Sequence, residues 1–183
     1  TAFTADSVAE LSISADASEI RRASAWLETA GLEHSIPAEL INRLDLCLNE
    51  ALANIIAHGG PAARSSPVRL YFHAQRAPDS NQAAVTVSDS GVAFDPLAFK
   101  PRPVPQTLSE AEPGGLGLVM MQGSADYISY RYCEGRNQLT FGMFGLTRGE
   151  MGLGANLISL KADMGTGVVL RGEVISLGLI DFA

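Results

Sequence analysis

Apolar positions recur at two different periods along the chain, and the change of period marks its structural elements. Residues 8–14 alternate apolar and polar side chains, which predicts a strand with one buried face. From Pro37 to about His58, apolar side chains return every three or four positions, which predicts a long amphipathic helix with proline in its first turn. The predicted apolar stripe of this helix comprises Leu40, Leu44, Cys47, Leu48, Ala51, Leu52 and Ile55.

The rest of the pattern alternates short apolar runs with turn-forming residues. Asp16, followed three positions later by Glu19, resembles a capping box and predicts a first helix that ends at Gly31. Glycines within 114–117 open a short apolar helix that is expected to reach about Ala125. Strands are predicted over 68–74 and 83–88, joined by a loop at 78–81, and over 127–133 and 138–144, joined by a turn at 134–137. Without an internal repeat, this order of elements predicts an α+β fold.

Composition and charge narrow the class of protein. The 183 residues are 46% hydrophobic, enough for one compact domain that buries roughly 70% of its unfolded surface. A formal net charge of -7 disfavours a general binder of nucleic acid or of anionic membranes. Cys47 and Cys133 lack the spacing of a disulfide framework or a zinc site, and no run reaches the ~18 apolar residues of a membrane span. We therefore expect a soluble protein of the cytoplasm.

The first candidate site lies in the long helix, where Glu50 and Asn54 are four residues apart. This spacing places both side chains on one helix face. An asparagine carbonyl oxygen is a suitable ligand for Mg²⁺, and a neighbouring carboxylate can accept a proton from an attacking hydroxyl or water. Asn54 is thus the candidate metal ligand and Glu50 the candidate catalytic base. Taken alone, the spacing favours an ordinary solvated helix face, and His58 is interpreted as a C-terminal residue near the last helix carbonyls.

The second candidate site occupies residues 89–96, directly after a predicted strand. A carboxylate at a strand end can accept a hydrogen bond from the exocyclic amine of adenine, and a glycine two residues later lets the backbone approach the base. Asp89 and Gly91 fit these two roles. Phe94 is expected to pack in the core below the site, and Asp95 to brace the start of the next loop. Taken alone, these residue types favour an ordinary strand-ending turn.

The third candidate site is a glycine-rich turn that precedes the short apolar helix. Backbone amides at such a helix start can meet phosphate oxygens, although a flexible hinge would have the same composition. The preceding residues 99–113 carry four prolines and are predicted to form a loop in which Lys100 and Arg102 could meet a terminal phosphate; solvated loop charges are the alternative. The candidate nucleotide-contacting residues of the turn are Gly114, Gly115, Leu116, Gly117 and Leu118.

In order and spacing, the three motifs resemble those of the GHKL (histidine kinase-like) ATPase superfamily. Over about residues 8–145 the chain is similar to its bacterial branch of anti-sigma-factor serine/threonine kinases. The resemblance implies a two-layer α/β sandwich, the Bergerat-type ATP-binding fold, with a mixed, mainly antiparallel sheet and helices on one face. It also implies ATP and Mg²⁺ as cofactors. The implied roles are base for Glu50, Mg²⁺ ligand for Asn54, adenine recognition for Asp89 and Gly91, and lid closure over the phosphates for Gly115 and Gly117.

The resemblance further implies a set of partners. The chain would transfer the γ-phosphate of ATP to a serine of an antagonist protein, and its homodimer would hold a sigma factor inactive, without direct contact to nucleic acid or membrane. A non-catalytic, nucleotide-dependent binding switch and a simple ATPase remain alternatives. Residues 1–145 are expected to form the ATPase domain, and residues 146–183 an extension that adds strands or an interaction segment. Near the first helix, Arg21 and Arg22 would supply the basic contribution to sigma-factor binding.

Overall fold

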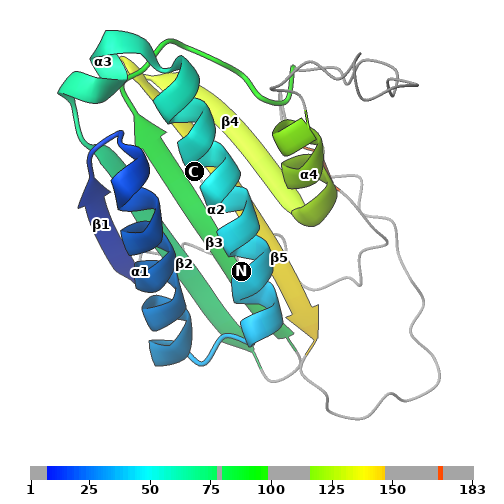
Figure 1. Ribbon diagram of the computed structural model, residues 1–183. Helices are drawn as coiled ribbons and strands as arrows, with labels where there is room; N and C mark the ends of the chain where they lie inside the picture. Colours follow the sequence, from blue (N-terminus) through cyan, green and yellow to red (C-terminus); the bar gives the residue numbers. More distant parts are fainter. Residues whose placement is uncertain (1–7, 78–79, 99–115, 147–168, 171–183) are drawn as a thin grey trace, which may run out of the picture.

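The computed structural model describes residues 8–77, 80–98, 116–146 and 169–170, and its helices cover one face of an antiparallel sheet (Figure 1). The helices are α1 (Ile20–Glu33), α2 (Ala38–His58), α3 (Gly60–Ser65) and α4 (Leu116–Ser124). The strands are β1 (Ala9–Ile13), β2 (Val68–Ala77), β3 (Ser80–Asp89), β4 (Tyr127–Cys133), β5 (Arg136–Leu146) and β6 (Val169–Leu170).

The sheet has the strand order β1-β2-β3-β5-β4-β6, and every pairing among the described strands is antiparallel. The predicted α+β fold, with helices on one face of a mainly antiparallel sheet, is therefore confirmed. β3 and β5 pair at the centre, so that Asp89 at the end of β3 lies opposite Asn137 near the start of β5. This register places the start of the second sequence motif beside a strand that comes almost fifty residues later.

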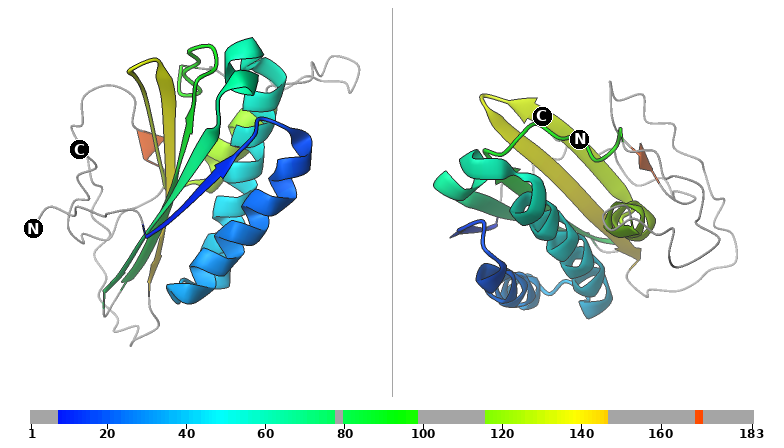
Figure 2. Two further views of the ribbon diagram at one scale, coloured as in Figure 1. Left: turned by 90° about the vertical axis from the view of Figure 1, so that its left-hand side faces the viewer. Right: turned by 45° about the horizontal axis from the view of Figure 1, so that its top comes forward.

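The core lies between the sheet and the helices (Figure 2). Successive strand side chains point to opposite faces, so alternate residues of β3 such as Ala83, Val85 and Val87 face the helices. The apolar stripe of α2 packs against these side chains, and Ile55 is partly buried against the same core. The buried residues of α2 are Leu40, Ile41, Leu44, Cys47, Leu48, Ala51 and Leu52. The long helix predicted from the 3.6-residue period is confirmed, with Pro37 directly before its first residue.

The start of the first helical segment differs from the predicted capping box. Asp16 does act as a cap, because its Oδ1 accepts a hydrogen bond from the Ser18 amide at 2.8 Å, at the start of a 3₁₀ turn over Ala17–Glu19. The hydrogen bond from the Ser18 hydroxyl and, to a smaller extent, the one from its backbone amide lower the pKa of the Asp16 carboxyl. The Glu19 carboxylate instead pairs with Arg22 at 2.8 Å. In a capping box, the Glu19 carboxylate would accept a hydrogen bond from the Asp16 amide. Here it forms an ion pair with Arg22 instead.

The prediction that the first helix ends at Gly31 is wrong. α1 continues to Glu33, and Gly31 is buried within it. A Cβ at this position would come within 2.5 Å of the Ile41 side chain of α2. The glycine therefore permits close approach of two helices, a tertiary reason that the local sequence pattern does not contain.

Two further features were not predicted. The turn-rich segment after α2 contains the short helix α3, and the β2–β3 hairpin extends to Ala77 and Ser80, beyond the predicted strand ends. Val169 and Leu170 of the C-terminal extension pair with Ile128 and Tyr127 at the edge of the sheet. The other residues beyond 146 lie outside the described part, so the division into 1–145 and 146–183 stays a prediction. Among the described helices, none combines the length and apolar character needed to cross a membrane.

Shortening the core side chain of Leu44 should destabilise the protein strongly. Leu44 is a fully buried residue of α2, so Leu44→Ala leaves a cavity and should lower the free energy of unfolding by about 3 kcal/mol in urea denaturation. The matched control is Leu32→Ala on α1, where the side chain is 73% exposed and the expected change is below about 0.5 kcal/mol. Equal effects of the two substitutions would contradict the packing described here.

Candidate functional site

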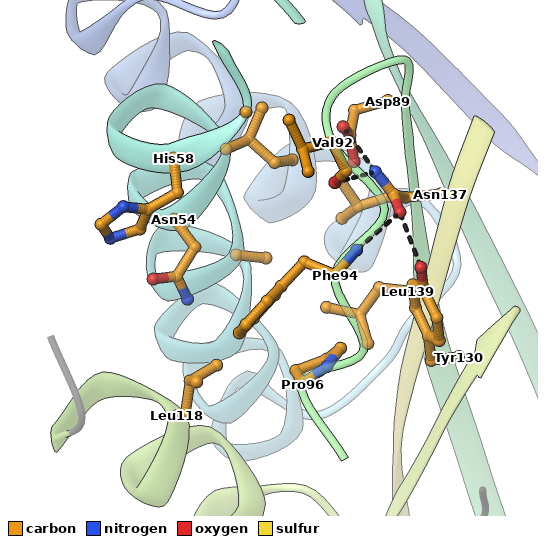
Figure 3. Close-up of a pocket in the computed structure, with 14 residues that line it drawn as sticks. Asn54, His58, Asp89, Val92, Phe94, Pro96, Leu118, Tyr130, Asn137 and Leu139 are labelled. Carbon is orange, nitrogen blue, oxygen red and sulfur yellow. Dashed lines mark hydrogen bonds between the residues drawn. The ribbon is translucent and has the colours of Figure 1, made fainter. Parts of the chain in front are cut away.

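A pocket opens beside the C-terminal half of α2, against the segment that follows β3 (Figure 3). α4 and the strands β4 and β5 complete its wall, and its cavity volume is about 80 Å³. The lining residues are Ala51, Asn54, Ile55, His58, Gly59, Val87, Asp89, Val92, Phe94, Pro96, Leu118, Tyr130, Asn137 and Leu139. Most of these side chains are apolar, and a few polar groups converge among them, as is usual for small-molecule sites.

The pocket brings together residues from all three sequence motifs. Asn54 comes from α2, Asp89 from the end of β3 and Leu118 from the first turn of α4, and all three line the same pocket. His58, interpreted from sequence as a helix-terminal residue, also lines it from the last turn of α2. One space is therefore shared by the candidate metal ligand and the candidate adenine acceptor.

Asp89 is a buried carboxylate, and the two hydrogen bonds described here end on the same one of its oxygens. It is only 6% exposed, and its Oδ1 accepts hydrogen bonds from the Gly91 amide at 2.7 Å and from the Asn137 side-chain amide at 3.0 Å. Burying a carboxylate is costly unless hydrogen bonds compensate, and these two supply that compensation. Because both bonds named here end on Oδ1, Oδ2 keeps its lone pairs for a donor that enters the pocket.

Asn137 organises the loop after β3, and sequence reasoning did not identify it. Its Nδ2 donates to Asp89 Oδ1 and to the carbonyl oxygens of Gly91 at 3.3 Å and Val92 at 3.2 Å. Its Oδ1 accepts from the Phe94 amide at 3.3 Å and from the Tyr130 hydroxyl at 2.7 Å. The only available sequence signal was an asparagine in a turn, which is ordinary; its role follows from the β3–β5 register.

The loop is also held against the end of α2. The Val92 amide donates to the Gly59 carbonyl oxygen at 3.1 Å. A Cβ on Gly91 would lie 2.9 Å from both the Cα and the carbonyl oxygen of Gly59, closer than real Cβ contacts come. Gly91 is thus required where two backbones meet, and the candidate adenine-approach residue has a structural reason to be glycine.

Arg136 holds the same region from β5, one residue before Asn137. Its guanidinium donates to Ser88 Oγ at 2.8 Å, to Ser90 Oγ at 2.7 Å and to the carbonyl oxygens of Ser88 and Pro67. Ser88 and Ser90 flank Asp89 in the chain, so Arg136 and Asn137 together constrain the backbone on both sides of the buried carboxylate. Five donors in a rigid plane make arginine suited to such a cluster.

Phe94 differs from its sequence prediction, whereas Asp95 agrees with it. Phe94 was expected in the core, but its side chain is 48% exposed and lines the pocket, with its ring reaching toward α2 (Figure 3). The Asn137 bond to its backbone amide places it there. Asp95 Oδ1 accepts from the Leu97 amide at 2.8 Å and so braces the loop, as expected. Burial raises the pKa of Tyr130, and its hydroxyl donates to Asn137 Oδ1.

α4 packs along α2 through three residues of one helical stripe. Arg43 donates to the Ser124 carbonyl oxygen at 2.7 Å and forms an ion pair with Asp126 at 2.6 Å, while Cys47 Sγ lies 3.9 Å from the Met121 carbonyl oxygen. Burial raises the pKa of the Cys47 thiol to about 12. At the other end of α4, a Cβ on Gly117 would overlap the carboxylate of Glu50. Glu50 therefore faces α4 and is not among the residues that line the pocket.

Several predicted site residues cannot be placed. Lys100, Arg102, Gly114 and Gly115 lie outside the described residues, and Leu116 is described only as the first backbone position of α4. Over the described ranges, no group of three or more His, Cys, Asp or Glu side chains is arranged to hold a metal ion.

The comparisons with known proteins identify the class of this chain. A model of the family described as histidine kinase-like ATPase domain matches residues 13–143. The chain therefore belongs to the histidine kinase-like ATPase family, for which nucleotide binding is implied.

Two particular proteins resemble the chain. The serine/threonine-protein kinase BtrW of Bordetella bronchiseptica is 32% identical over 130 residues, which cover 71% of this chain and 89% of that protein. The crystal structure of the RsbU and RsbW domains of Rv1364c from Mycobacterium tuberculosis aligns with a TM-score of 0.49 at 18% identity, and the alignment covers 78% of this chain and 34% of that chain.

Removing the side-chain amide of Asn137 should loosen the loop and destabilise the protein. Asn137→Ala leaves the buried Asp89 carboxylate and two loop carbonyls without their shared donor, so unfolding should become easier by about 2 to 3 kcal/mol in denaturant titrations. Asn42→Ala, at an exposed position of α2, is the control and should change stability by less than about 0.5 kcal/mol. An equally small change for Asn137→Ala would refute the organising role of this side chain.

Proposed function

We propose that the protein is an ATP-dependent kinase that transfers the γ-phosphate to a serine or threonine side chain of a partner protein. The observation that carries this proposal is the single pocket lined by both Asn54 and Asp89. Membership of the histidine kinase-like ATPase family and similarity to a serine/threonine-protein kinase support the same reading. The reaction requires recognition of the base, neutralisation of phosphate charge and removal of a proton from the hydroxyl.

Asp89 would recognise adenine in this pocket. Its Oδ1 is occupied by Gly91 and Asn137, which orients Oδ2 for the exocyclic amine of the base. Guanine carries a carbonyl oxygen at the corresponding ring position, which two lone pairs of a carboxylate repel. The geometry therefore supports preference for ATP over GTP.

Asn54 would contribute one oxygen to a Mg²⁺ ion that accompanies the nucleotide. Mg²⁺ prefers hard oxygen ligands and usually keeps several waters beside phosphate oxygens, so one side-chain amide in the pocket suits it. When bound, the ion supplies neutralisation of the phosphate charge. Asn54 lies on α2 about one turn after Glu50.

Glu50 would serve as the general base. As the serine oxygen bonds to the γ-phosphorus, the hydroxyl proton passes to the Glu50 carboxylate, the bond from the γ-phosphorus to the bridging oxygen breaks and ADP leaves. Glu50 lies beside the first turn of α4, next to the pocket wall formed by Leu118. Its position at this edge would let the acceptor hydroxyl approach from outside the nucleotide pocket.

The proposed partners follow the resemblance to anti-sigma-factor kinases. The phosphate acceptor would be an antagonist protein and the regulated partner a sigma factor, bound by a homodimer of this chain. Arg21 and Arg22 of α1 are exposed and free of the pocket, so they could meet an acidic partner surface. Arg22 already pairs with Glu19, which reduces its share of that contact.

A nucleotide-dependent switch without phosphoryl transfer is the second candidate. It is favoured by the placement of Glu50 against Gly117 and off the pocket wall. A switch would bind nucleotide and partner in the Glu50→Ala variant as in the wild type, and would leave no labelled protein with γ-³²P ATP. A kinase would label the partner, and Glu50→Ala would abolish the label.

Removing the Asn54 amide should weaken the metal-dependent part of nucleotide affinity. In calorimetric titrations, the wild type should bind ATP and ADP more tightly with Mg²⁺ than without it. In Asn54→Ala, this gain in affinity from Mg²⁺ should be at least about tenfold smaller, which corresponds to about 1.4 kcal/mol. Asn42→Ala on the same helix is the matched control and should retain the metal dependence. Metal-independent binding by the wild type would count against the site.

Exchanging the Asp89 carboxylate for an amide should change base selectivity. Asp89→Asn keeps the shape, and its Oδ1 can still accept from Gly91 and Asn137, but it places an NH₂ donor where the base amine approaches. The ratio of GTP to ATP dissociation constants should fall at least about tenfold, because guanine can accept this donor. Asp95→Asn, which alters a loop carboxylate outside the pocket lining, should keep the ratio. An unchanged ratio in Asp89→Asn would remove Asp89 from base recognition.

A further inference from the structure

Gly117, a predicted phosphate-contacting residue, lies directly against the side chain of Glu50. A Cβ built on Gly117 would overlap the Oε2 of Glu50 and come within 2.8 Å of its Cδ. The carboxylate therefore lies directly against the backbone of the first turn of α4. Any side chain at position 117, even a methyl group, would occupy the place where this carboxylate now lies.

The rest of the α2–α4 contact fixes this arrangement. Arg43, Cys47 and Glu50 follow one another at intervals of four and three residues, which places them along one side of α2. Arg43 contacts the end of α4 through Ser124, and Glu50 meets its start at Gly117. α4 therefore runs in the direction opposite to α2, beside it (Figures 1 and 2).

A second bond ties α4 to the pocket wall. Gln122 Nε2 donates to the Pro96 carbonyl oxygen at 3.2 Å, in the loop that follows Asp89. Asp126, the partner of Arg43, also accepts from the Phe144 amide of β5 at 2.9 Å. α4 is thus anchored to α2, to the loop and to the sheet, so its first turn cannot easily shift to make room for a larger residue at 117.

We propose that Gly117 is a positioning residue for Glu50: the absence of a side chain there lets α4 seat directly on the carboxylate and sets where that carboxylate lies. The functional part of this inference rests on the proposed role of Glu50 as the base. A glutamate side chain has several rotatable bonds, so an added methyl at 117 displaces the carboxylate at little cost to the fold. Proton abstraction depends on hydrogen-bond distance, so such a displacement slows the reaction while the nucleotide still binds.

The test compares Gly117→Ala with the wild type in two independent measurements. In the first, the ¹³C resonance of the Glu50 side-chain carboxyl, assigned by its loss in Glu50→Gln, should shift in Gly117→Ala in the nucleotide-free protein. The added methyl group would meet only the flexible side chain of Glu50, so melting temperatures should agree within about 3 °C. An unshifted Glu50 resonance would overturn the inference, whatever the protein does with nucleotide.

In the second measurement, turnover is separated from binding. Gly117→Ala should lower kcat for ADP formation at least tenfold, while the KM for ATP and the calorimetric Kd for ADP stay within twofold of the wild type. If Gly117 served phosphate contact instead, ADP would bind more than fivefold more weakly and adenosine would bind unchanged, and that outcome would overturn the inference. Failure of the wild type to bind any nucleotide would remove the proposed function, and the carboxyl resonance would still decide whether Gly117 positions Glu50.

Discussion

The hydrogen bond between Asp89 and Asn137 is the interaction on which the pocket depends. It joins residues that face each other across the β3–β5 pairing, and the same asparagine holds the backbone of the loop that forms the pocket wall. A carboxylate that is almost fully buried needs such donors, because the lost hydration must be replaced. The loop therefore takes its conformation from the central strands, and both Phe94 and Asp89 line the pocket as a result.

α2 serves the fold and the site with different sides of one helix. Its apolar stripe lies on the sheet, Arg43, Cys47 and Glu50 meet α4, and Asn54 faces the pocket. Because the apolar stripe determines how the helix is rotated about its axis, it also determines where each polar residue points. The separation of Glu50 from Asn54, one turn apart yet facing different neighbours, follows from this rotation and from the docking of α4.

Sequence predictions were correct where they rested on local patterns and wrong where contacts between residues far apart in the chain decided the structure. The extent of α2 was predicted closely because a 3.6-residue period over twenty-one residues is a local signal repeated many times. Gly31 was taken for a helix end because glycine is common there, yet it is buried for contact with Ile41 on another helix. Phe94 was predicted to lie in the core, but the hydrogen bond from its backbone amide to Asn137 holds it at the pocket. Asn137 itself carried no local signal.

The amino-acid sequence alone determined the α+β class, the long helix with Glu50 and Asn54 on it, and the motif that begins at Asp89, since each rests on periodicity or on the spacing of neighbours in the chain. Only the tertiary structure decided that Asn137 and Arg136 hold that motif, that Phe94 enters the pocket and that Glu50 lies under Gly117. The physical reason is that these contacts join residues far apart in sequence, and their geometry is set by strand register and helix docking.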